Sequence, residues 1–149
     1  MTSITFKTSN MLYNIFRLTN MKKQNVTQIS EKIAQTLQAV SSPQRIAILI
    51  AIGQGEACVC HLETALGWRQ AYISQHLRAL RKANILQDRR AGRYVYYKLQ
   101  NAKILDLILD SAALSGLPAE SVSALINTQI YPACECPQCA PVLIPTSSL

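Results

Sequence analysis

The stretch R-Q-A-Y-I-S-Q-H-L-R-A-L-R-K, residues 69–82, has two chemically different sides when it is wound into a helix. Ile73, Leu77 and Leu80 fall on one side, where they form an apolar stripe. The opposite side carries small, polar and basic residues: Ala71, Gln75, Arg78 and Lys82. The pattern therefore predicts a helix from about residue 69 to residue 83 that buries one side and exposes the other.

The flanking segments place this helix in a larger motif. Residues 58–66 predict a short helix that Gly67 closes. Residues 85–90 and 93–99 predict a β-hairpin, because the second run, R-Y-V-Y-Y-K-L, is rich in β-branched and aromatic residues. Helix, turn, helix and hairpin follow one another in the order of a winged helix-turn-helix. We therefore predict a mainly α fold with a small β-hairpin.

Four further helices complete the prediction. Ile29, Ile33, Leu37 and Val40 recur at helical spacing, and Ser41-Ser42-Pro43 ends that helix and starts another that runs to Ile52. An apolar stripe predicts a helix over about residues 102–114, formed by Ile104, Leu105, Ile108 and Leu109. Pro118 opens a last short helix that runs to about Asn127, and the tail beyond it is expected to be irregular.

The charge of the chain and its predicted motif favour double-stranded DNA as a partner. Formal net charge is +7 and the isoelectric point is about 9.4. The helix over residues 69–83 offers polar side chains to base edges and phosphates, and the hairpin tip offers arginines to the minor groove or flanking backbone. The alternative is a solvated polar face on a structural helix pair. The predicted DNA-binding residues are Arg69, Gln70, Tyr72, Ser74, Gln75, Arg78, Arg89, Arg90 and Arg93.

The five cysteines fall into two tight clusters, Cys58 with Cys60 and Cys134 with Cys136 and Cys139. No apolar run approaches the roughly 18 residues of a membrane span, and the N-terminus lacks the order of a secretory signal. We therefore expect a cytoplasmic protein without a membrane partner, in a compartment where thiols stay reduced. Clustered cysteines in such a compartment favour metal binding or redox sensing over structural disulfides.

From about Ile29 to Leu114 the chain resembles the ArsR/SmtB family of metal-responsive repressors. The resemblance rests on S-S-P-Q-R-I-A-I-L, E-A-C-V-C-H-L, Q-A-Y-I-S-Q-H-L-R-A-L and R-R-A-G-R-Y-V-Y-Y-K-L. It implies a homodimer joined through the first and last helices of the core, which binds a palindromic operator and releases it when an effector binds.

With that family in view, we expect three parts in the chain. Residues 1–25 would form an N-terminal extension, and residues 26–116 the winged helix-turn-helix domain for DNA binding and dimerisation. Residues 117–149 would hold a short helix and the cysteine-containing tail.

Cys58 and Cys60 are two residues apart, so in a regular helix their side chains would diverge by about 200°. They can share an ion only if the start of the helix is irregular. The alternative is that Cys58 and Cys60 are small buried hydrophobic residues without a metal-binding role. Two thiolates are also too few, because soft ions such as As(III), Cd(II), Pb(II) and Zn(II) want three or four sulfur or nitrogen donors.

The resemblance indicates where further donors are missing. Some family members add a cysteine three residues beyond the C-V-C box, residues 58–60, where this chain has Glu63. Others use N-terminal cysteines, which residues 1–57 lack. The second metal site of the family uses carboxylates and histidines on the last core helix, which here offers Asp106 and Asp110 without histidine. We expect that second site to be absent, with His61 as a weak extra donor to the first.

The cysteine-rich tail is the remaining source of donors. We expect Cys134, Cys136 and Cys139 to complete the ligand set begun by Cys58 and Cys60, within one chain or across the dimer. The alternative is that C-x-C-x-x-C forms a separate site.

Four functions follow for comparison. The favoured one is a transcriptional repressor that senses a thiophilic metal or metalloid, with arsenite ahead of Cd(II), Pb(II) and Zn(II). The second is a thiol-redox or persulfide-sensing repressor of the same fold. An enzyme is not expected, because the sequence has no activated nucleophile, cofactor loop or acid–base pair. A DNA-binding protein with purely structural zinc is a further alternative.

Overall fold

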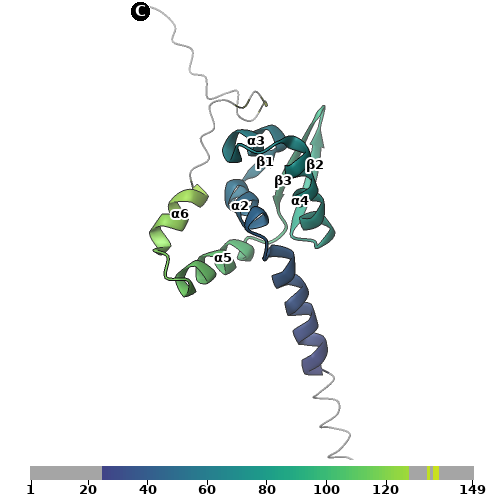
Figure 1. Ribbon diagram of the computed structural model, residues 1–149. Helices are drawn as coiled ribbons and strands as arrows, with labels where there is room; N and C mark the ends of the chain where they lie inside the picture. The colour runs from purple at the N-terminus through teal and green to yellow at the C-terminus, as the bar shows by residue number, and fades with distance from the viewer. Residues whose placement is uncertain (1–24, 128–133, 135, 138–149) are drawn as a thin grey trace, which may run out of the picture. The chain divides into compact units, whose positions relative to one another are not determined.

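The computed structural model describes residues 25–127, 134, 136 and 137 (Figure 1). Residues 1–24 of the predicted extension 1–25 and most of the tail therefore lie outside the described residues. The chain divides after Gln38 into two units. In the first unit, residues 25–38 are helical and carry exposed apolar side chains at helical spacing: Val26, Ile29, Ile33 and Leu37. The predicted helical periodicity is confirmed there.

The second unit begins at Ala39 and is built around helix α2, Pro43–Ile52. Its proline occupies the first turn, where the missing N–H costs nothing, and Ser42 precedes it with an extended backbone. Ile48, Leu49 and Ile52 are fully buried at the centre of the core. The helix ends at Gly53 as predicted; this residue has φ 56°, which glycine adopts without steric cost.

Helices α3, Val59–Leu66, and α4, Gln70–Lys82, form the helix-turn-helix. The predicted buried side of α4 is confirmed, since Ile73, Leu77 and Leu80 have at most 1% of their surface exposed. They pack with α2 and α3 in the core, so the opposite side of α4 faces outward.

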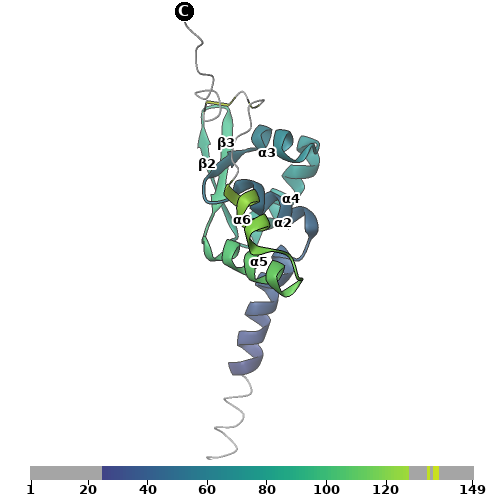
Figure 2. The ribbon, with the colours of Figure 1, turned by 90° about the vertical axis from the view of Figure 1, so that its left-hand side faces the viewer.

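The hairpin over strands β2, Leu86–Ala91, and β3, Tyr94–Leu99, is also confirmed. A third strand, β1, Glu56–Cys58, pairs antiparallel with β3, so the sheet order is β1-β3-β2 (Figure 1). Figure 2 shows the two hairpin strands, β2 and β3, side by side. Strand β1 was not predicted from the sequence, where a helix was expected from residue 58.

The two faces of this sheet have different neighbours, because successive side chains of a strand alternate between faces. Ala57, Leu86, Tyr97 and Leu99 pack against the helical core. Cys58 and Tyr96 point the other way and belong to a second buried cluster. The second face is central to the candidate site.

Helices α5, Lys103–Leu114, and α6, Ala119–Asn127, follow the hairpin. Ile104, Leu105 and Ile108 of the predicted stripe are buried, whereas Leu109 is half-buried. Helix α6 packs through Val122 and Ile126 against the same core. Within the described part of the chain, each helix is too short or too polar to cross a bilayer.

Candidate functional site: a thiol cluster beside the winged helix

Cys58 is the N-cap of α3, and this position resolves the spacing problem of the C-V-C box. Its backbone is extended, with φ −84° and ψ 168°, whereas Cys60 lies within the first helical turn. The two side chains therefore do not follow helical geometry and converge, with 2.8 Å between their Sγ atoms. The backbone N–H of His61 donates to Cys58 Sγ at 3.4 Å, which satisfies one free donor of the helix start.

Two cysteines of the tail, Cys134 and Cys136, lie beside this helix start. Cys134 Sγ lies 3.1 Å from Cys60 Sγ and 3.7 Å from Cys58 Sγ. Together with Cys136, the four sulfur atoms lie within 4.8 Å of one another. We name Cys58, Cys60, Cys134 and Cys136 the thiol cluster; all four belong to one chain. This arrangement favours the shared-site hypothesis over a separate tail site, while Cys139 lies outside the described residues.

The thiol cluster is buried, and burial governs its protonation. Burial, followed by the hydrogen bond with Cys60, raises the pKa of the Cys58 thiol above its ordinary range. Burial likewise raises the pKa of Cys60 to about 11. Both thiols are therefore protonated at neutral pH and hydrogen-bonded within the cluster. An ion that binds them must displace those protons, so its affinity depends on pH.

The size and chemistry of the cluster fit one soft ion. Four sulfurs at about 2.3 Å from a zinc ion lie about 3.8 Å from one another. The observed separations, from 2.8 Å to at most 4.8 Å, bracket that value. Thiolates are also the donors that Zn(II) and other thiophilic ions prefer. The four cysteines would hold such an ion, and bound there it would tie the tail to the start of α3.

Residues with the weaker predicted roles lie elsewhere. Among the described residues the candidate metal group consists of cysteines alone, so His61, expected as an extra donor, is not part of it. His61 is buried, and burial lowers its pKa. Glu63 is half-buried on α3, and Asp106 and Asp110 are exposed on α5.

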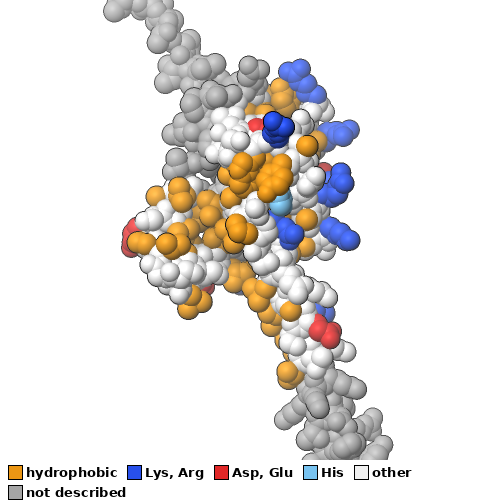
Figure 3. Space-filling model, viewed as in Figure 1, with side chains coloured by type: hydrophobic (Ala, Val, Ile, Leu, Met, Phe, Trp, Pro, Cys, Tyr) orange, Lys and Arg blue, Asp and Glu red, His pale blue; other side chains and the backbone are white. Residues whose placement is uncertain are grey.

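The predicted DNA-binding side of α4 is open to solvent. Arg69 is the N-cap of the helix, and it is exposed together with Gln70, Tyr72, Gln75 and Arg78, whereas Ser74 is half-buried. The Tyr72 ring packs edge-on against two other rings. Its ring centroid lies 5.6 Å from the ring centroid of Trp68 and 4.8 Å from that of His76. Lys and Arg side chains gather along the right-hand edge of Figure 3, where Figure 1 shows α4 and the hairpin.

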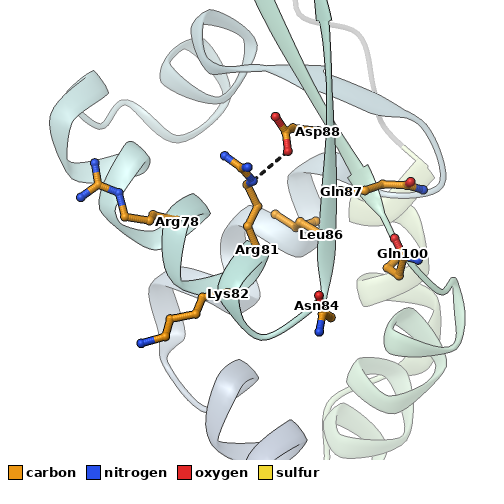
Figure 4. Close-up of a pocket in the computed structure, with 8 residues that line it drawn as sticks. All are labelled: Arg78, Arg81, Lys82, Asn84, Leu86, Gln87, Asp88 and Gln100. Carbon is orange, nitrogen blue, oxygen red and sulfur yellow. Dashed lines mark ion pairs between the residues drawn. The ribbon is translucent and has the colours of Figure 1, made fainter.

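A shallow pocket of about 620 Å³ separates the end of α4 from β2. Arg81 turns into it and pairs with Asp88 at 2.8 Å, whereas Arg78 and Lys82 point away from the strand (Figure 4). Arg81 is not among the residues predicted from the sequence to bind DNA. Its ion pair joins the C-terminal turn of α4 to the hairpin and leaves the other two cations available for a polyanion.

The three hairpin arginines do not share one environment. Arg89 pairs with Glu56 at 2.7 Å, and its guanidinium lies 5.0 Å from the ring centroid of Tyr96. Arg90 is exposed, and strand alternation places it on the opposite face of β2. Arg93 lies over the Tyr94 ring near the tip. Arg89 thus lies on the face that carries the thiol cluster; the DNA contacts of all nine residues remain predictions.

Comparison with known proteins identifies the family. The profile of the bacterial regulatory proteins of the arsR family matches residues 42–88, from the N-cap of α2 into β2. Over 79 residues the chain is 38% identical to the arsenical resistance operon repressor of Escherichia coli (strain K12), a match that covers 48% of this chain and 68% of that one. The chain belongs to the arsR family.

Two further similarities support this assignment to the arsR family. The HTH-type transcriptional repressor SmtB of Mycobacterium tuberculosis is 34% identical over 89 residues, which cover 60% of this chain and 66% of that relative. The match thus spans just under two thirds of SmtB. Reduced HlyU from Vibrio cholerae N16961 has a similar structure, with a TM-score of 0.56 and 27% identity over 61% of this chain and 96% of HlyU. The winged helix-turn-helix fold predicted from the sequence is confirmed.

Proposed function

We propose that this protein is a transcriptional repressor that binds a DNA operator as a homodimer and releases it when a thiophilic metal or metalloid binds the thiol cluster. The observation that carries the proposal is the convergence of four thiols at the start of α3. Helix α3 packs directly against α4. An ion held by Cys58 and Cys60 would therefore act on the helix that supports the DNA-binding side.

Operator binding is supported by the exposed side of α4 and by the net charge of +7. The E. coli and M. tuberculosis relatives are both named repressors, which favours the same activity here over an enzyme. Two α4 helices related by a two-fold axis would read the two halves of a palindromic operator.

A homodimer is supported by the helical residues 25–38. Val26, Ile29, Ile33 and Leu37 lie along this segment with 46–66% of their surface exposed. A continuous apolar stripe of this kind is typical of a surface that another helix covers. We infer that the partner subunit covers it.

Arsenite is the favoured effector, because As(III) needs only three thiolates and a relative is an arsenical resistance operon repressor. Cd(II), Pb(II) or Zn(II) would use all four sulfurs. Single Cys→Ser variants distinguish these ions: with arsenite, one cysteine of the cluster is dispensable for DNA release, whereas with a four-coordinate ion none is. The readout is operator release by the reduced protein, and thiolate absorption per bound ion reports the number of sulfur ligands.

The proposal is tested by following operator binding with fluorescence anisotropy while arsenite or Cd(II) is added. Cys58→Ser and Cys60→Ser should bind operator as the wild type does without metal, because serine nearly preserves the volume of cysteine. Both variants should fail to release it when metal is added. Val59→Thr, which changes the residue between the cysteines without removing a sulfur, is the matched control and should release normally. Release by both serine variants at the wild-type metal concentration would rule out the proposed sensor site.

Thiol-redox or persulfide sensing is the second candidate, and the short sulfur separations of 2.8 Å and 3.1 Å within the cluster favour it. The two functions separate under strong reductant. A metal sensor keeps its response there, whereas a redox sensor responds to an oxidant or persulfide and loses that response when the reductant is restored.

A further inference from the structure

One row of side chains crosses all three strands beside the thiol cluster. Cys58 on β1 pairs in register with Tyr96 on β3, and Tyr96 pairs in register with Arg89 on β2. Residues that are directly opposite in neighbouring strands point to the same face of a sheet. The row therefore runs from a thiol of the cluster to the outer strand of the hairpin.

Tyr96 joins the cluster to the sheet. It is 97% buried, and it belongs to one buried cluster with Cys58, Cys134 and Cys136. Its hydroxyl is hydrogen-bonded to Cys136. Burial and the nearby Cys136 raise the pKa of Tyr96 to about 12.

Arg89 holds the other side of the same ring. Its guanidinium lies 5.0 Å from the ring centroid, within the range of a cation–π contact. The salt bridge to Glu56 fixes the guanidinium across the sheet from β2 to β1. Arg89 therefore contacts Glu56 and Tyr96 on the sheet face that carries the thiol cluster.

We propose that Tyr96, held by Arg89, is a positioning residue that couples the thiol cluster to the hairpin wing. The proposal rests on the proposed function and adds its regulation: a change in the arrangement of Cys58 and Cys136 reaches β3 through the Tyr96 ring and hydroxyl. From β3 it reaches β2, because Arg89 pairs with Tyr96 and Arg90 pairs with Val95. The wing arginines Arg90 and Arg93 are thereby moved relative to α4, without any contact between these arginines and the effector.

The test compares Tyr96→Phe with Tyr97→Phe in the reduced full-length chain. Tyr97 is the matched control, because it is the next residue of β3 and packs on the opposite face against the helical core. For each protein, operator affinity is measured by anisotropy without arsenite and with saturating arsenite, and their quotient is the release ratio. Thiolate absorption reports arsenite stoichiometry separately.

We expect Tyr96→Phe to bind arsenite at the wild-type stoichiometry and to lower the release ratio at least about threefold, within the range found for residues that carry coupling. Tyr97→Phe should keep the wild-type ratio. Arg89→Gln, read by the same ratio, should also lower it and serves as the second variant if Tyr96→Phe does not fold by circular dichroism.

The outcomes distinguish the coupling from the function on which it rests. A wild-type release ratio of one overturns the proposed function and the coupling together. A normal wild-type ratio that Tyr96→Phe and Arg89→Gln both retain overturns the coupling alone. An equal loss in Tyr97→Phe also overturns it, because the effect would then belong to the strand as a whole.

Discussion

At the scale of single residues, the backbone of Cys58 decides whether the C-V-C box is a site. With helical angles its sulfur would diverge from that of Cys60, whereas the extended N-cap conformation brings them to 2.8 Å. Arg89 and Arg90 show a similar dependence on position. They are adjacent in sequence, yet strand alternation places one beside Tyr96 and leaves the other on the opposite face.

This difference predicts unequal effects on operator binding. Arg90→Ala should weaken binding to all sequences and reduce the slope of log affinity against log salt by about one, as expected for one lost phosphate contact. Arg89→Ala should change that slope by clearly less, because the guanidinium is engaged by Glu56 and Tyr96. Salt titrations of operator affinity in the metal-free protein measure both. Equal slopes for the two variants would contradict the assignment of faces.

The two histidines predict a loss of stability in mild acid. Burial lowers the pKa of both below the ordinary value of 6.5, and at His76 nearby Arg45 adds to the effect. The unfolded chain therefore binds more protons as pH falls through about 6.5. The stability that is fully present above that pH is lost below it.

Urea unfolding at about pH 7.5 and about pH 5.5 measures this loss, in a window above the titration of ordinary carboxylates. The free energy of unfolding should be lower at the acid pH, and His76→Gln should lose less of it than the wild type. A wild-type protein with the same free energy at both pH values would disprove the prediction.

At the scale of elements, α4 follows directly from its sequence. The spacing of Ile73, Leu77 and Leu80 settles which side is buried, and the structure buries those three residues. The outward side is then available for DNA, and its function depends on the core only through the orientation of the helix.

Replacing both Gln75 and Arg78 by Ala should consequently weaken operator binding without changing stability or metal stoichiometry. Each lost base contact of this kind costs about 1–3 kcal/mol of discrimination. Competition between operator and random DNA measures it, with Lys103→Ala on α5 as an exposed basic control. An operator preference that survives the double change would mean that another surface reads the DNA.

Local pattern predicted the helices and the hairpin, but it did not predict contacts between distant segments. Strand β1 has three residues and no alternation of its own, and it exists because β3 offers partners to Glu56, Ala57 and Cys58. Tyr96 is buried by cysteines about forty residues further along the chain. The clustering of cysteines was visible in the sequence, whereas the N-cap geometry and the row from Cys58 to Arg89 required the fold.

At the scale of the whole molecule, the thiol cluster joins two parts of one chain that are far apart in sequence. Cys134 and Cys136 reach the Cys58–Cys60 pair of the same chain, so a dimer would carry two complete clusters. Ordering the tail costs conformational entropy, and ion–thiolate bonds are strong enough to offset it.

Mixed dimers distinguish this arrangement from one that crosses the dimer. One subunit carries Cys58→Ser and Cys60→Ser, and the other is cut after Tyr131. If each cluster forms within one chain, the mixed dimer has no complete set of ligands and should keep its operator when metal is added. Anisotropy of purified mixed dimers measures this. Release at the wild-type metal concentration would show that the tail serves the partner subunit.

The most direct measurement compares the full-length chain with the chain cut after Tyr131. Operator release is followed by anisotropy while arsenite is added to each reduced protein. Both should bind operator equally without metal, because Cys134 and Cys136 lie on the sheet face opposite the helical core. The cut chain should need at least about tenfold more arsenite for release, since it lacks two of the four thiols of the cluster. Release of both proteins at the same arsenite concentration would contradict a sensor site that includes the tail.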